Sequence, residues 1–113
     1  MKRFLISFDE GSMDHISEAE LPAVSADTHA VVADAKRAGV WIFGAGLGRQ
    51  RMSVVAADGT ITEGPDTQTK AVVGGFSIIE TATREAALEW AARFAASCRC
   101  AQDVRELFYD PES

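Results

Sequence analysis

The side chains best suited to chemistry are a histidine and two carboxylates. His29 is the strongest single candidate, because an imidazole titrates near neutral pH and can give or take a proton. Glu63 and Asp66 lie three positions apart across Gly64-Pro65, and two carboxylates in a constrained loop can differ in pKa, so that one serves as an acid. The pattern is compatible with proton transfer. A surface histidine and a turn built for backbone reasons would, however, give the same residues.

Three further side chains could hold a small substrate near these groups. Arg49 or Lys70 could bind an anionic group, although a cation near an acidic loop is often only a solvated ion-pair partner. Trp41 could line a pocket or pack in the core, and hydrophobic periodicity does not separate the two roles. We therefore expect Arg49, Lys70 and Trp41 to contact a small organic molecule.

Two other motifs do not support a cofactor or a metal. Gly44, Gly46 and Gly48 are followed by another apparent strand, whereas a dinucleotide-binding fingerprint places its glycines at the start of a helix. Cys98 and Cys100 lack the second Cys or His pair that would complete a set of four zinc ligands. We expect no cofactor and no bound metal.

Strands and helices must position these side chains. Residues 2–8 place Phe4, Ile6 and Phe8 on one side and Leu5 and Ser7 on the other, the two-residue period of a strand. Residues 71–80 are apolar on both faces, which indicates a central strand. Helices are expected over 22–38, preceded by a Ser17-x-x-Glu20 capping box, and over 83–97, with Thr83 as N-cap. The remaining expected strands are 40–43, 51–57, continuing briefly at 61–62 after a two-residue Asp58-Gly59 hairpin turn, and 103–109.

This order predicts one domain over residues 1–113 with an α+β, ferredoxin-like fold of the dimeric α+β barrel type. Two helices would cover one face of an antiparallel sheet. No helix is left to cover the other face, and an apolar face left in water marks an interface or a ligand groove. We expect a homodimer that packs through this open sheet face.

Charge and composition exclude several classes of partner. Seventeen acidic against eleven basic side chains give a formal charge of −6, which opposes binding to nucleic acid. No stretch approaches the roughly 18 apolar residues of a membrane span, and the first apolar run ends at Asp9, too short for a signal peptide. With only two cysteines, two positions apart, we expect a reduced, cytoplasmic protein without membrane contact.

The chain resembles the YCII-related family, specifically its DGPF-motif branch. The resemblance rests on Gly64-Pro65, Lys70, Gly74-Gly75-Phe76, the helix segment 86–91 and Asp103-Val104-Arg105. It implies a dimeric ferredoxin-like fold. In some relatives it also implies a small-molecule site where a histidine, in the helix that carries His29 here, and an acidic residue act as acid and base.

Two departures from the family pattern concern the acidic residues. Glu63 and Asp66 stand where the motif has Asp and Phe. The Asp-Pro-Tyr that relatives carry after the second helix is absent, and Ala95-Ala96-Ser97 are the nearest residues. If that aspartate acts in the relatives, this chain lacks it or uses another carboxylate.

Two functions fit these observations. The first is a small cofactor-independent enzyme, or enzyme-like protein, that binds a small organic molecule between sheet and helix. His29, Glu63 and Asp66 would carry out its acid–base chemistry. The alternative is a non-catalytic dimeric module that binds a metabolite or a protein partner.

Overall fold

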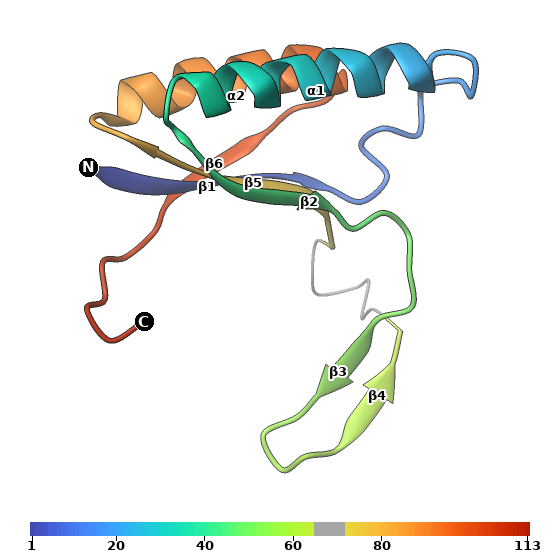
Figure 1. Ribbon diagram of the computed structural model, residues 1–113. Coiled ribbons are helices and arrows are strands. Elements are labelled where there is room, and N and C mark those ends of the chain that lie inside the picture. The colour runs from blue at the N-terminus through green and yellow to red at the C-terminus, as the bar shows by residue number, and fades with distance from the viewer. Residues whose placement is uncertain (65–71) are drawn as a thin grey trace.

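The computed structural model describes residues 1–64 and 72–113. Its helices and strands follow one another in the order that the sequence predicts (Figure 1). Asp66 and Lys70, two of the expected site residues, lie outside the described residues. In chain order the elements are β1 (Lys2–Asp9), α1 (Leu21–Arg37), β2 (Trp41–Gly46), β3 (Ser53–Val55), β4 (Ile61–Glu63), β5 (Val73–Thr81), α2 (Arg84–Cys98) and β6 (Asp103–Glu106).

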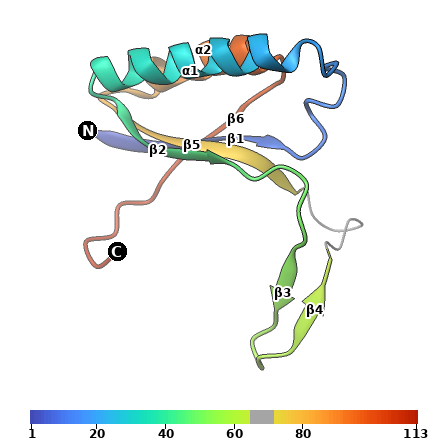
Figure 2. The same cartoon turned by 45° about the vertical axis from the view of Figure 1, so that its right-hand side comes forward.

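Four strands form one antiparallel sheet in the order β2-β5-β1-β6. Strand β5 is central, as its two apolar faces predict, and pairs with both β1 and β2. Both helices lie on the same face of this sheet (Figures 1 and 2). The α+β, ferredoxin-like fold expected from the order of elements is therefore confirmed.

The core lies between the helices and the sheet. Phe4 and Ile6 from β1 and Ile79 from β5 are fully buried, and burying each such side chain is worth about 2 kcal/mol. They face Val31 of α1 and the α2 residues Ala87, Ala91 and Phe94. The two alanines are small, so α2 can lie close to the strands.

The two helices begin differently. The Thr83 hydroxyl accepts a hydrogen bond from the Ala86 N–H at 3.1 Å, so Thr83 is the N-cap of α2, as expected. At α1 only half of the expected capping box forms. The Glu20 carboxylate accepts hydrogen bonds from the Ser17 N–H at 3.4 Å and from the Ser17 hydroxyl at 2.9 Å, but this turn precedes the helix. Glu20 is the N-cap residue, and no side chain caps the first turn of α1.

Strands β3 and β4 form a separate two-stranded arm that projects from the sheet (Figures 1 and 2). The Ala56 N–H donates to the Thr60 carbonyl at 2.8 Å, so the loop comprises residues 57–59 and is one residue longer than the expected two-residue turn. Gly59 has a positive φ of 91° there, which a glycine adopts without strain. The radius of gyration is 15.7 Å, against about 13 Å for a compact chain of this length, as expected for a molecule with a projecting arm.

The last strand stops at Glu106 rather than at Tyr109. Its partner β1 begins at Lys2, and after the Leu107 N–H has bonded to the Arg3 carbonyl little of β1 remains to pair with. Phe108 and Tyr109 therefore leave the sheet and are 100% and 90% exposed.

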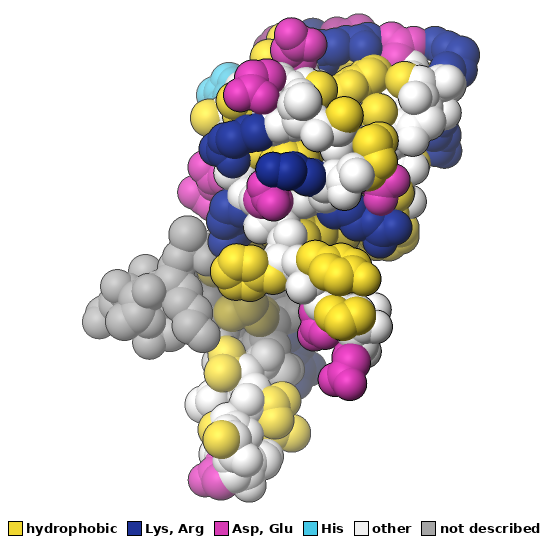
Figure 3. Space-filling view, turned by 90° about the vertical axis from the view of Figure 1, so that its left-hand side faces the viewer, with side chains coloured by type: hydrophobic (Ala, Val, Ile, Leu, Met, Phe, Trp, Pro, Cys, Tyr) yellow, Lys and Arg dark blue, Asp and Glu magenta, His cyan; other side chains and the backbone are white. Residues whose placement is uncertain are grey.

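In Figure 3, charged side chains of both signs cover much of the upper half, and hydrophobic side chains are also exposed in the lower half, where parts of the chain project below the sheet. Within the described residues, neither helix is both long and apolar enough to span a bilayer.

Candidate functional site

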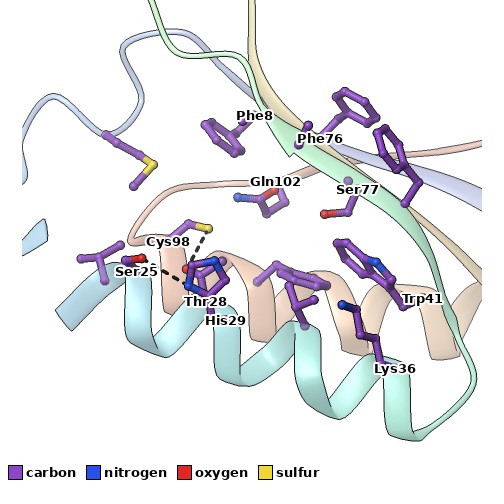
Figure 4. Close-up of a pocket in the computed structure, with 18 of the residues that line it drawn as sticks. Phe8, Ser25, Thr28, His29, Lys36, Trp41, Phe76, Ser77, Cys98 and Gln102 are labelled. Carbon is purple, nitrogen blue, oxygen red and sulfur yellow. Dashed lines mark hydrogen bonds between the residues drawn. The ribbon is translucent and has the colours of Figure 1, made fainter. Parts of the chain in front are cut away.

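A cavity of about 600 Å³ lies between α1 and the sheet (Figure 4). Helix α1 contributes one wall, and strands β1, β2 and β5 contribute the other. The end of α2 and the segment after it close the space between them. The residues used below are, from α1, Ser25, Thr28, His29 and Lys36; from the strands, Phe8, Trp41, Gly44 and Ser77; and Phe94, Cys98 and Gln102 from the C-terminal part.

Glycines in the sheet allow aromatic rings to lie flat against the strands. A Cβ atom on Gly44 would stand 2.6 Å from the Trp41 indole, and one on Gly75 would stand 2.5 Å from the Phe8 ring. Strand β2 also changes register between Trp41 and Phe43, just before Gly44. The glycine-dense segment thus contains both features that glycines in a strand indicate, an irregularity and a close approach.

The aromatic wall of the cavity continues from the sheet to α2. The rings of Trp41 and Phe94 are 6.0 Å apart and tilted by 39°, a geometry typical of favourable aromatic pairs. Trp41 packs against the core and also lines the cavity, so it has both of the roles that its position in the sequence allows.

The polar wall of the cavity comes mainly from α1. Thr28 and His29 lie three and four positions after Ser25, and Lys36 lies seven positions after His29, so these side chains lie on one side of the helix. The Ser25 hydroxyl lies 3.3 Å from Nδ1 of His29, and the Thr28 hydroxyl lies 3.6 Å from Sγ of Cys98. His29 is exposed, so it stands at the mouth of the cavity.

The expected site residues are only partly brought together. His29 and Trp41 both line the cavity. Arg49 lines a smaller neighbouring hollow of about 300 Å³, where its guanidinium pairs with Asp14 and, at 3.5 Å, with Glu10. Arg49 therefore ties the loop after β1 to the loop after β2.

Glu63 lies on the projecting arm, and it does not line the cavity. The Arg51 guanidinium donates to its carboxylate at 2.8 Å and the Ser53 hydroxyl donates at 3.0 Å. These hydrogen bonds lower the pKa of Glu63 below its usual value, so this carboxylate is ionised at neutral pH. In the described structure, Glu63 and His29 therefore do not line a common cavity.

Sequence reasoning missed several polar residues of the cavity. Ser25 could have been found from its spacing of four to His29, and Thr28 from its spacing of three to Ser25, because helix positions three or four apart are neighbours. Ser77 and Gln102 carry no such signal, since their place beside His29 depends on how β5 and the segment after α2 pack. Among the described residues, no group of three or more His, Cys, Asp and Glu side chains could hold a metal ion.

Comparisons with known proteins agree with this fold. A model of the YCII-related domain matches residues 4–101. Among solved structures, the chain is similar to 5-chloro-2-hydroxyhydroquinone dehydrochlorinase from Burkholderia phenoliruptrix AC1100, in complex with 2,5-dihydroxybenzoquinone. The TM-score is 0.53 and the identity is 16%, with 99% of this chain and 98% of the other covered, so the likeness is one of fold. No curated protein matches the chain.

Proposed function

Because the chain belongs to the YCII-related domain family, we propose that it is a small enzyme that uses no cofactor and binds a compact organic molecule between α1 and the sheet. His29 would transfer a proton to or from that molecule. The observation that carries the proposal is the position of His29 at the mouth of a cavity with aromatic walls. A preformed, mostly apolar cavity with a few polar groups is the usual form of a small-molecule site.

Ser25 supports this role for His29. Its hydroxyl hydrogen-bonds to Nδ1, which orients the imidazole and leaves Nε2 as the ring nitrogen available to a ligand. A general acid or base has to reach the proton that it transfers directly or through one water, and a ligand in the cavity would lie within that reach.

The second ionisable group of the reaction would come from the substrate. Among residues 1–64 and 72–113, no aspartate or glutamate lines the cavity. A substrate with an acidic hydroxyl, such as a phenol or an enol, would supply the group that Glu63 was expected to supply. The dihydroxybenzoquinone bound by the structurally similar dehydrochlorinase is a compound of this kind.

That no carboxylate of the described residues lines the cavity also supports the alternative, a non-catalytic module that binds a metabolite. In that case His29 would contribute a hydrogen bond at the mouth of the cavity and no proton transfer. The two functions differ in what the loss of the imidazole would change.

The experiment compares the wild-type protein with His29→Gln, using 2,5-dihydroxybenzoquinone and simple dihydroxybenzenes as probes. Thermal shift measures binding, and NMR in D₂O measures exchange of ring protons and any turnover. We expect His29→Gln to retain binding within a few-fold and to lose about 100-fold or more in exchange or turnover, the usual size of a general acid–base contribution.

The matched control is His15→Gln, because His15 is the other histidine of the chain and lines neither hollow. It should behave as the wild type in both assays. Binding without any exchange or turnover in the wild type would favour the non-catalytic module, and the absence of binding would contradict both functions.

A further inference from the structure

We infer that the cavity selects an organic anion, and that Lys36 binds the anionic group beside Trp41. This inference rests on the proposed function, because it specifies the ligand class of the same cavity. It starts from a contrast in charge. The protein carries a formal charge of −6, yet no aspartate or glutamate of the described residues lines the cavity. Lys36 is the only Lys or Arg side chain among them that does.

The arginines that pair with carboxylates of α1 have their charges matched. Arg37 and Arg93 both pair with Asp34, which bridges α1 and α2 on the outer surface. Arg99 pairs with Asp27 at 2.8 Å. Their charges are therefore largely neutralised by neighbouring groups, and none of these arginines lines the cavity.

Lys36 differs from these arginines. Within residues 1–64 and 72–113 no carboxylate lies within 4.0 Å of its amine. Asp34 is two positions away on the helix and so points to another side. A basic residue in the last turn of a helix also stabilises the helix dipole, but Arg37 supplies that charge as well. The helix dipole therefore does not explain why Lys36 is directed toward the cavity.

The side chains around Lys36 fit a flat anion. Figure 4 shows its amine directed from α1 toward Trp41, and the Ser77 hydroxyl directed into the cavity from the sheet. A ring stacked along Trp41 could place a carboxylate or phenolate oxygen at the amine, with Ser77 as a second donor. Hydrogen bonds to an ionised group are the stronger ones, so this end of the cavity would discriminate between an anion and its neutral analogue.

Benzoate and benzamide test the inference, because they have nearly the same shape and only benzoate is charged. Binding of each is measured by NMR titration, following the indole N–H of Trp41. Wild-type protein should bind benzoate more tightly than benzamide, and added salt should weaken only the binding of benzoate. Lys36→Met should weaken benzoate binding about tenfold or more, the usual effect of losing a charge-assisted hydrogen bond, and should leave benzamide binding unchanged.

Two further variants serve as controls. Lys36→Arg keeps the charge and should keep most of the preference for benzoate. Arg37→Met removes a neighbouring charge that is paired with Asp34 outside the cavity, and it should change neither affinity. Far-UV circular dichroism and the Tm establish that each variant is folded, which the exposure of Lys36 favours.

The outcomes separate this inference from the proposed function. If wild type and Lys36→Met bind benzoate and benzamide equally well, the anion site is wrong and the cavity still binds small molecules. Failure of the wild type to bind benzoate, while it binds benzamide or a dihydroxybenzene, also overturns the anion site alone. Failure to bind any of these probes would contradict both the anion site and the proposed cavity function.

Discussion

At the scale of single residues, the shape of the cavity depends on two glycines that carry no chemistry. Gly44 and Gly75 leave space that the rings of Trp41 and Phe8 occupy, so these rings stay close to the strands and the volume between sheet and α1 stays open. A glycine in a strand has no side chain to pack against its neighbours, and an aromatic ring that lies over the glycine supplies that contact.

We therefore expect Gly44→Ala to damage the cavity. The added methyl group would stand 2.6 Å from the indole and 2.9 Å from the carbonyl oxygen of Phe76, so the ring or the strand has to move. Overpacking of this kind costs about 1–3 kcal/mol. Urea denaturation should show that loss, and the fluorescence of Trp41 should change with it. Gly46→Ala is the control, since a Cβ there meets nothing within 4 Å, and equal effects of the two variants would contradict the explanation.

At this scale the chemistry of a side chain is enough to select it as a candidate, but its position depends on the fold. His29 could be selected for its imidazole and Trp41 for its ring, and both line the cavity. The position of Glu63 relative to the cavity could not be predicted, because Glu63 lies on the β3–β4 arm. The local sequence does not determine the direction in which this arm projects. Lys36 was missed because a basic residue near a helix end usually has a local explanation.

At the scale of elements, the helices and the central strand were predictable because their signals are local. Periodicity fixes the buried stripe of each helix, and Thr83 marks the start of α2. The arm was less predictable. Residues 51–57 resemble a longer strand, but only Ser53–Val55 find a partner, because β4 is equally short.

The cap of α2 gives a prediction at this scale. Thr83→Ala removes the acceptor for the Ala86 N–H, which should lower the free energy of unfolding by about 1 kcal/mol. Thr83→Ser keeps a hydroxyl at the same position and should lose much less. Urea denaturation of the three proteins gives the comparison, and a Thr83→Ala protein as stable as the wild type would show that the hydrogen bond contributes nothing.

At the scale of the whole molecule, the sheet has a second apolar face. Residues directly opposite on paired strands share a face, so Phe43 and Leu5 lie on the same side as Ile78. The ring of Phe76 lies 5.9 Å from that of Phe43, and both residues are also among those that line the cavity. Phe43 is 56% exposed, and no described helix covers this side (Figure 1).

We propose that a second copy of the chain covers this face, burying about 800 Å² on each partner as stable interfaces do. Sedimentation at micromolar concentration should then show a dimer. Phe43→Glu would place a charge in the interface and should give a monomer. Leu88→Glu changes a comparably exposed apolar residue on α2 and should remain dimeric. A monomeric wild type, or a dimer that Phe43→Glu leaves intact, would contradict this interface.

Strand β5 carries the cavity and this second face in alternation. Ser77 points into the cavity, while the strand register places its neighbour Ile78 on the opposite side of the sheet. Adjacent residues of β5 therefore contact the ligand site on one side and the proposed dimer interface on the other. If a ligand prefers the assembled protein by some factor, thermodynamic linkage requires that it strengthen assembly by the same factor. The strand that places Ser77 would in that way make occupancy of the cavity and self-association mutually dependent.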